Sequence, residues 1–310
     1  MAKGRGDSGY CAKGGDDTDN QKNVKCEIVP AMKLGKFQID VIVENTSYVD
    51  GGMMFGVVPK KLWAKDVQVN GQNLVPMDLN VFVIRTGEQT ILVDTGLGEI
   101  LTEKQQKMYG TDPESKLESG LAELGIKPDQ VDYVIHTHLH LDHIGGAVKD
   151  DGNGNPVPRF SEAQHIVQKL EWEAANNPDE RSEAAYDKSK FMPLYDAGQL
   201  KIIEGNVELI AGIKLVLTGG HTMGHQGVIV ESEGERLFLF ADIVPFEAHI
   251  RPAYVASADL FPLETIKIKK ELLPEIAQHG WYLGFDHEID IKVCRIVDNG
   301  MKLVAEKVEV

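Results

Sequence analysis

A dense cluster of imidazole and carboxylate side chains follows a short apolar run in the middle of this chain. The run spans residues 131–135 and predicts a buried strand. His138, His140, Asp142 and His143 then follow within six residues. Imidazole and carboxylate groups are the ligands that zinc-like divalent cations take. A polar loop whose histidines only form hydrogen bonds is the alternative, but it gives no reason for so many ligands beside a strand. The cluster therefore predicts a metal site.

The spacing of these ligands indicates two metal positions. If the chain stays extended through His138 and His140, their rings point the same way, because side chains alternate across a strand. Asp142 and His143 would then lie on the following turn and face a second point in space. One short loop can therefore serve two neighbouring cations.

The pattern His-x-His-x-Asp-His resembles the signature of the metallo-β-lactamase-fold hydrolases, most closely their lactonase and methyl-parathion-hydrolase-like branch. That family supplies a histidine, a bridging aspartate and a last histidine further along the chain. This chain offers His221, Asp242 and His287 in that order, each just after a strand-like run. The resemblance covers nearly everything from about residue 37 onward. It implies an α/β fold, an αββα sandwich of two mixed β-sheets flanked by helices.

The resemblance also implies two divalent metal ions held by seven side chains. Three histidines would hold one ion, two histidines and a carboxylate would hold the other, and a second carboxylate would bridge them. These groups are, in that order, His138, His140 and His221; Asp142, His143 and His287; and Asp242. Zinc is the expected metal, and manganese, iron and cobalt stay open because all of them accept such ligands.

Two such cations, about 3.5–4 Å apart, would share a hydroxide, because metal binding lowers the pKa of water toward about 7. That hydroxide would attack the electrophilic carbonyl or phosphoryl centre of a substrate. Asp142 and Asp242 are the expected catalytic carboxylates, since either one could shuttle the proton. The sequence does not distinguish between them.

Asp94 is the expected supporting residue of the metal site. It ends a strand-like run immediately before Thr95-Gly-Leu-Gly98. In the family, an aspartate at this place accepts a hydrogen bond from a ligand histidine and fixes its tautomer. An aspartate that only caps the turn is the alternative.

The ligand set narrows the class of hydrolase that the resemblance implies. Metallo-β-lactamases proper usually replace one ligand of the second site, whereas Asp142 and Asp242 are both present here. We expect hydrolysis of a lactone or ester, of the acyl-homoserine-lactone type or a related small substrate. A phosphotriester (organophosphate) hydrolase is the alternative within the branch. A mononuclear iron dioxygenase on the same fold is the alternative of another class.

One departure from typical lactonases concerns a tyrosine. Those proteins place a tyrosine three residues after the bridging aspartate, where this chain has Pro245. Tyr254 is a candidate replacement.

Two apolar segments are candidates for a substrate pocket. Met54 and Phe55 follow paired glycines, and a similar segment overhangs the metal cleft in the related branches. Phe246 and His249 follow the predicted bridging aspartate, and His249 could reach the cleft. The alternative is that these residues belong to the ordinary core.

The charge balance favours a small-molecule substrate. The 310 residues carry a formal net charge of −16, whereas surfaces that bind nucleic acid are basic. The same charge argues against anionic membrane surfaces, and no apolar run approaches the ~20 residues that a membrane span needs. The N-terminus has no apolar core of a secretory signal, so a cytoplasmic location is the default expectation. A homodimer stays one open possibility.

The chain is expected to form one folded domain after a tail. Residues 1–30 are rich in glycine and polar residues and predict a flexible tail, and residues 31–310 predict a single metallo-β-lactamase-like domain. The three cysteines are scattered and predict no disulfide framework. Residues 263–278 are helical in pattern, and Pro274 is expected to kink or restart that helix.

Overall fold

Two β-sheets pack face to face in this protein, with helices on both outer surfaces. The computed structural model describes residues 28–308. Each of the two sheets has seven strands, and a separate two-stranded ribbon consists of β6 (Val148–Asp150) and β7 (Pro156–Pro158). Both large sheets are mixed, so the predicted sandwich of two mixed sheets is confirmed.

The first sheet joins an antiparallel half to a parallel half. Its strands, in spatial order, are β1 (Ile28–Leu34), β2 (Phe37–Asp50), β3 (Leu74–Arg85), β4 (Thr90–Val93), β5 (Tyr133–Ile135), β8 (Gln164–Gln168) and β9 (Leu200–Ile203). β1 to β4 pair antiparallel, whereas β4, β5, β8 and β9 pair in parallel. Antiparallel neighbours can be joined by a tight turn, as β3 and β4 are at residues 86–89. Each parallel step needs a longer connection, which brings the helices onto the outer face.

The second sheet is antiparallel except at one pairing. Its strands, in spatial order, are β10 (Val207–Ile210), β11 (Ile213–Leu217), β12 (Gln226–Ser232), β13 (Glu235–Leu239), β14 (Tyr282–Gly284), β15 (Val293–Asp298) and β16 (Leu303–Lys307). Only β13 and β14 pair in parallel within this described sheet, and α8 (Pro262–His279) lies in the connection between them.

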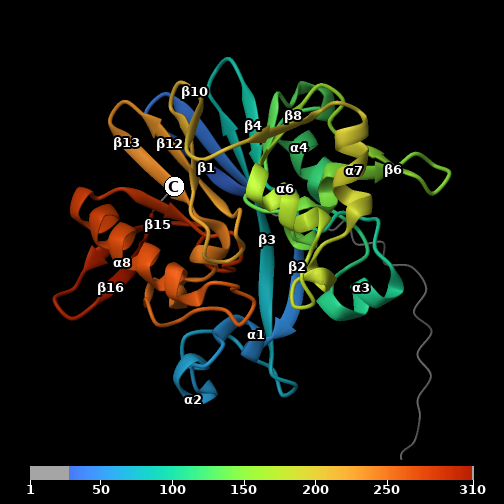
Figure 1. Ribbon diagram of the computed structural model, residues 1–310. Helices are drawn as coiled ribbons and strands as arrows, with labels where there is room; N and C mark the ends of the chain where they lie inside the picture. The colour runs from blue at the N-terminus through green and yellow to red at the C-terminus, as the bar shows by residue number, and fades with distance from the viewer. Residues whose placement is uncertain (1–27, 309–310) are drawn as a thin grey trace, which may run out of the picture.

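Helices cover the outer faces of the two sheets. Figure 1 shows α8 outside the second sheet, and α4, α6 and α7 together outside the first. These three helices, and the helices not yet named, have the bounds α1 (Gly51–Phe55), α2 (Lys60–Trp63), α3 (Glu103–Tyr109), α4 (Leu117–Glu123), α5 (Leu141–Ile144), α6 (Lys169–Asn176) and α7 (Lys188–Asp196). Short 3-10 turns lie at Pro128–Gln130, Gly145–Ala147, Glu183–Ala185, Ala241–Ile243 and Glu247–Ile250.

The main apolar core lies between the two sheets. Ile39 and Val41 of β2 belong to the same buried cluster as Val228 and Val230 of β12. In both pairs the residues are two positions apart, because alternate side chains of a strand point to the same face. The strand patterns of the sequence therefore place both sheets against one core.

Two expectations about element boundaries are wrong. β1 begins at Ile28, so residues 28–30 belong to the first sheet and not to the predicted tail, because their backbone pairs with β2. Residues 1–27, the rest of that tail prediction, lie outside the described residues. α8 also continues through Pro274, because Leu273 and Ile276 beside it are buried in an apolar cluster that includes the second sheet.

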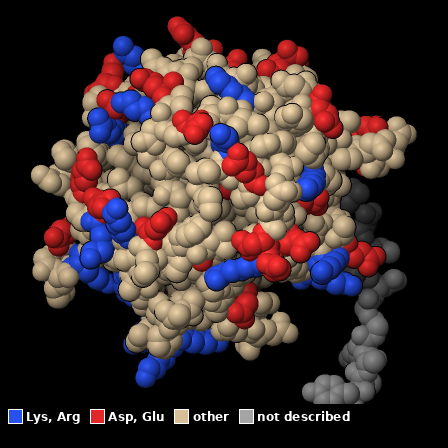
Figure 2. All heavy atoms as spheres, in the orientation of Figure 1, with Lys and Arg blue, Asp and Glu red and all other residues tan. Residues whose placement is uncertain are grey.

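The outer surface mixes both signs of charge. Figure 2 shows acidic and basic side chains interleaved over one face of the molecule. Of the helices between residues 28 and 308, none has the length and apolar composition needed to cross a bilayer.

Candidate metal centre

The predicted ligands follow the ends of strands that run in parallel directions. The His138 loop follows β5, which pairs in parallel with β4, and Asp94 directly follows β4. Asp242 and His287 follow β13 and β14, which pair in parallel in the second sheet. Parallel strands end at the same edge of a sheet, so side chains that are distant in sequence gather at one edge of the sandwich.

Three histidines form the first group of this site. His138, His140 and His221 each present a ring nitrogen within 4.8 Å of the other two. The ring centroid of His138 lies 4.5 Å from that of His140 and 4.8 Å from that of His221. The backbone at His140 is extended, with φ −64° and ψ 151°, as the alternation argument assumed. All three rings are buried.

The second group combines a short helix with the end of β14. α5 carries Asp142 and His143, and their ligand atoms lie within 4.8 Å of a ring nitrogen of His287. The Nε2 atoms of His143 and His287 are 3.3 Å apart. The turn that the sequence predicted after His140 therefore faces a second point, as expected.

Asp242 lies between the two groups. Its Oδ2 is 3.1 Å from Nε2 of His221, and its Oδ1 is 3.0 Å from Nε2 of His287. The same two oxygens lie 3.8 Å from His138 Nε2 and 3.7 Å from His143 Nε2, respectively. The geometry thus turns one oxygen of this carboxylate toward each group.

Hydrogen bonds donated by the Nδ1 atoms of the ligand histidines show that the second group fits a cation. Nδ1 of His143 donates to Oδ2 of Asp94 over 2.9 Å, and Nδ1 of His287 donates to the carbonyl oxygen of Asp78 over 2.9 Å. In a neutral imidazole the other nitrogen then carries a lone pair. The lone pairs of the two Nε2 atoms would face each other and repel unless a positive charge lies between them.

The first group also directs the lone pair of a ring nitrogen into the centre. Nδ1 of His221 donates to Oδ1 of Asp259 over 2.9 Å, which directs its Nε2 lone pair into the centre. Nε2 of His138 and Oδ1 of Asp242 are buried and accept no hydrogen bond among the described residues. Buried polar atoms are nearly always paired, so these orphaned atoms fit a metal ion as their missing partner.

Comparison with known families decides the family of this chain. The model of the metallo-beta-lactamase superfamily matches residues 75–281, which is more than half of the sequence. The chain belongs to the metallo-beta-lactamase superfamily. The resemblance inferred from the sequence is therefore confirmed.

Similar proteins agree with this assignment. An N-acyl homoserine lactonase of Bacillus thuringiensis is 31% identical over 236 residues, which cover 69% of this chain and 83% of the relative. A crystal structure described as a probable metal-dependent hydrolase from Staphylococcus aureus is 31% identical, with a TM-score of 0.83, and covers 90% of this chain and all (100%) of its own. AidC, described as a dizinc quorum-quenching lactonase in complex with a product, has a TM-score of 0.76 at 19% identity, over 92% of this chain and 99% of its own. At that identity the likeness shows the fold alone.

The charges in this metallo-beta-lactamase centre shift each other's pKa values. Burial works to raise the pKa of Asp242, but the neighbouring His221 and His287 hold it well below its usual range. Burial works to lower the pKa of His143, but Asp94 and two further carboxylates raise it well above its usual range. Because a histidine binds metal in its neutral form, metal binding here would release a proton.

The backbone is strained at two points of the site. Asp94 has φ 58°, and Ala241, directly before Asp242, has φ 38°. Positive φ is uncommon for residues with a side chain, and such strain clusters at functional sites. At both points it turns the chain sharply at the end of a strand.

Glu171 joins both metal loops, although no sequence pattern indicated it. Its buried carboxylate accepts hydrogen bonds from the backbone of Leu139, from the hydroxyl of Thr222 and from the hydroxyl of Tyr186, over 2.9, 2.5 and 2.9 Å. Leu139 lies inside the first histidine loop, and Thr222 directly follows His221. Asp259, which holds His221, was also missed, because neither acid belongs to a ligand motif.

A cavity of about 420 Å³ opens beside His140. Its wall is mostly apolar and comes from residues 49–53, 108–109, 181–185 and 257–260. Its volume lies within the range of about 300–1,000 Å³ that is usual for small-molecule sites. It is therefore the candidate substrate pocket of this centre.

The four residues predicted for the pocket lie elsewhere, which corrects that expectation. They are Met54, Phe55, Phe246 and His249, and all four are buried. Nε2 of His249 donates to the carbonyl oxygen of Met54 over 2.8 Å, so its ring is held inside the core. Met53 lines the cavity instead. This segment is helical, and neighbouring side chains on a helix point in different directions.

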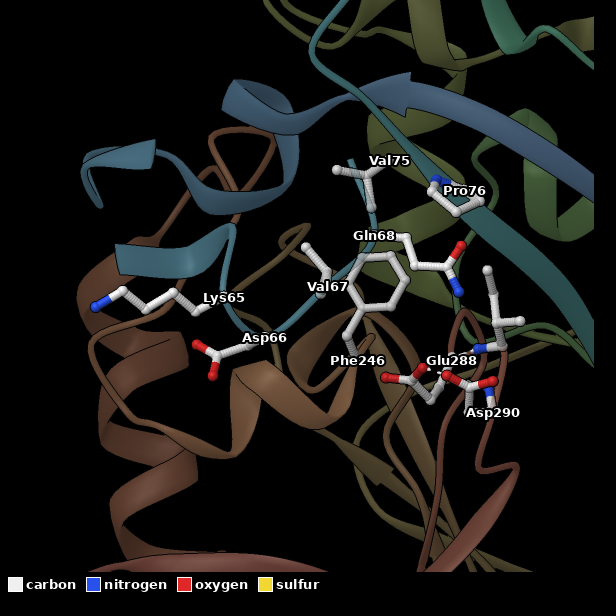
Figure 3. A pocket seen from close by; sticks show the side chains of 10 residues that line it. Lys65, Asp66, Val67, Gln68, Val75, Pro76, Phe246, Glu288 and Asp290 are labelled. Carbon is white, nitrogen blue, oxygen red and sulfur yellow. Dashed lines mark hydrogen bonds between the residues drawn. The ribbon is translucent and has the colours of Figure 1, made fainter. Parts of the chain in front are cut away.

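Phe246 lines a different cavity, of about 310 Å³. Figure 3 shows its ring beside Val67, with the carboxylate of Glu288 close by in the same pocket. The ring centroid of Phe246 is 6.4 Å from that of His287. Phe246 therefore lines this second cavity and also lies near a proposed metal ligand.

Proposed function

We propose that this protein is a metal-dependent hydrolase that opens lactone rings, with N-acyl homoserine lactones as the first substrates to test. The observation that carries the proposal is the position of Asp242, which turns one carboxylate oxygen toward His221 and the other toward His287. A carboxylate between two ligand groups suits a dinuclear centre. The similarity to a Bacillus thuringiensis N-acyl homoserine lactonase supports lactones as the substrate class.

We propose that two divalent ions, zinc in the first place, occupy the two groups. The first ion would bind His138, His140 and His221, the second would bind Asp142, His143 and His287, and Asp242 would bind both. Bound in this way, such ions supply a water molecule with a pKa lowered toward about 7 and polarise a carbonyl group. Manganese, iron and cobalt stay open for the same ligands.

Two carboxylates are proposed to move protons. The side chains of Asp142 and Asp242 each keep 14% of their surface exposed, whereas that of His138 keeps none (0%). These acids can therefore touch a substrate or water while the histidines stay enclosed. We propose that one of them takes the proton of the attacking water and delivers it to the leaving alcohol.

Two further carboxylates are proposed to hold ligands in place. Asp94 accepts from His143 and also from the backbone and hydroxyl of Thr137, over 2.8 and 2.7 Å. Asp259 accepts from His221 and from the hydroxyl of Thr265, the latter over 2.6 Å. Each carboxylate is thereby fixed by a second partner, so it holds its histidine in one orientation.

The cavity beside His140 suits a neutral ester with an apolar tail. Val49, Met53, Met108 and Leu260 line it, and they offer apolar surface rather than charge. A lactone bound at the metal centre could extend its tail along these side chains.

We also propose that residues 31–310 act as one domain, because both sheets contribute ligands. A cytoplasmic location stays a prediction, and the assembly state stays open.

The test is a hydrolysis screen of the protein loaded with zinc, manganese or cobalt. We expect N-acyl homoserine lactones to be opened, with metal analysis giving two ions per chain and a chelator abolishing turnover. His138→Ala is the matched inactive control. Turnover of aryl phosphotriesters without turnover of lactones would favour the organophosphate alternative. One iron per chain together with oxygen consumption would reject the hydrolase in favour of a dioxygenase.

A further inference from the structure

Six of the thirteen residues that line the cavity beside the metal centre carry a polar side chain, and most of these side chains already have partners. Asp50 accepts hydrogen bonds at the start of α1, and the hydroxyl of Ser257 donates to a backbone carbonyl of that helix. The hydroxyl of Ser182 bonds to a nearby aspartate. Arg181 is exposed, and it donates to backbone carbonyls of the facing loop. His140 belongs to the proposed metal ligands.

Tyr109 is the remaining polar side chain of this wall, and its hydroxyl is uncommitted. It is 7% exposed, and no hydrogen bond of its hydroxyl occurs within residues 28–308. The other buried phenols differ, because Tyr254 accepts from Arg251 and Tyr282 accepts from Arg295. The ring of Tyr109 is buried, but its hydroxyl oxygen is not one of the enclosed, unpartnered polar atoms of the described residues, so molecules that enter the cavity can reach it.

Tyr109 and His140, one of the proposed metal ligands, line the same cavity. Tyr109 belongs to the same apolar cluster as Leu141, which lies between His140 and Asp142. Burial, and after it the negative charges of Asp142 and Asp242, raises the pKa of its phenol well above the usual range. Even the ordinary phenol pKa of about 10 keeps this hydroxyl protonated near neutral pH. The group can therefore donate a hydrogen bond there.

The helix that carries Tyr109 is held at both ends. Thr102 and Gln105 form a reciprocal capping box at the start of α3, and Gly110 closes its end in the left-handed conformation. The amide of Gln105 also donates to Asp187 over 3.1 Å, which ties α3 to the segment that begins α7. The phenol is thus presented from a fixed backbone, as a positioned donor requires.

We propose that Tyr109 is a catalytic residue whose hydroxyl donates a hydrogen bond to the ring carbonyl oxygen of the lactone. This inference rests on the proposed lactone hydrolysis and adds to it a donor that comes from α3 rather than from a metal loop. The carbonyl oxygen gains negative charge as water attacks the ring carbon. A donor aimed at that oxygen therefore stabilises the transition state more than the bound substrate.

The test compares Tyr109→Phe with wild type, because this change removes only the hydroxyl. We expect kcat for an N-acyl homoserine lactone to fall by about 10- to 100-fold, with KM changed much less. Metal content and Tm should stay at wild-type values. Tyr282→Phe is the matched control, since it removes a buried phenol that accepts a hydrogen bond from Arg295 and does not line the cavity. Its kcat should stay within about twofold of wild type.

A binding measurement makes the test independent of turnover. Calorimetry with the ring-opened product, an N-acyl homoserine, should show a Kd about 3- to 10-fold higher for Tyr109→Phe than for wild type. Equal kcat or equal product affinity in the two proteins would overturn the role of Tyr109. So would a loss of metal or of Tm large enough to explain the lost activity. If wild type opens no lactone, the proposed function fails, and the product affinities still decide on Tyr109.

Discussion

Asp259 holds His221 from a loop 38 residues further along the chain, through a hydrogen bond of 2.9 Å from Nδ1 to Oδ1. Asp94 holds His143 in the same way and over the same distance. The two proposed metal positions thus have one buried carboxylate each behind a ligand histidine. This pairing makes the two positions separable by mutation.

Asp259→Ala is expected to weaken the first metal position, and Asp94→Ala the second. Each change removes the acceptor that orients one histidine, which typically costs about 10- to 100-fold in metal affinity. Metal titration followed by elemental analysis would measure the loss. Each variant serves as the control for the other, because Asp259 and Asp94 hold histidines of different metal groups. Equal weakening of both positions by either change would contradict the assignment.

Asp242→Asn is expected to leave fewer than two ions per chain. The amide keeps one oxygen but loses the charge and the second ligand oxygen, so it would serve one group at most. Elemental analysis after dialysis would count the ions. Asp290→Asn makes the same chemical change at an exposed position and should keep both ions. Two retained ions in Asp242→Asn would count against a bridging role.

Glu171→Ala is expected to lower the free energy of unfolding by about 2–4 kcal/mol, because three hydrogen-bond donors lose their acceptor. Burial raises the pKa of this carboxyl above its usual range. Denaturant unfolding would measure the change. Glu173→Ala removes an exposed acid of the same helix and should change stability by less than about 0.5 kcal/mol. Similar losses in the two variants would contradict the role of Glu171 in joining the two metal loops.

Glu44 is expected to make stability depend on pH. Its buried carboxyl accepts from the backbone of Leu97 and Gly98 over 3.1 and 3.2 Å, and burial raises its pKa from 4.5 to about 7. A raised pKa means that the folded state binds the proton more tightly than the unfolded state. The favourable contribution is therefore complete below pH 4.5 and is lost as the pH rises through about 7. The loss is on the order of 3 kcal/mol.

Unfolding of wild type and Glu44→Gln between pH 4 and pH 8 would check this expectation. The glutamine does not titrate, so the stability of wild type relative to the variant should fall as the pH rises. A difference that stays constant over this range would show that Glu44 does not titrate in it.

The ligand cluster at residues 138–143 could be predicted because its chemistry is local. A strand presents alternate side chains to one side, and the next turn presents others to a second side, so His138 and His143 face different points whatever surrounds them. The strand patterns and the turn at residues 86–89 are local in the same sense. The assignment of His221, Asp242 and His287 needed the family resemblance, because nothing in their spacing brings them together.

Contacts that depend on distant segments could not be predicted. The prediction that Met54 and Phe55 line the substrate pocket was wrong because the chain forms a short helix there. The packing of that helix decided that Met53 faces the cavity. The expected restart of the helix at Pro274 is wrong for a related reason, since burial of the neighbouring side chains keeps α8 continuous.

By itself the sequence determined the ligand types, their order along the chain and the strands that precede them, because these follow from side-chain chemistry and from the periodicity of strands. The arrangement of those strands in two sheets was implied by the family resemblance. Only the tertiary structure decided that Glu171, Asp259 and Tyr109 belong to the site. Their neighbours there lie tens of residues away along the chain. Which distant side chains meet depends on how sheets and helices pack, and no local pattern records it.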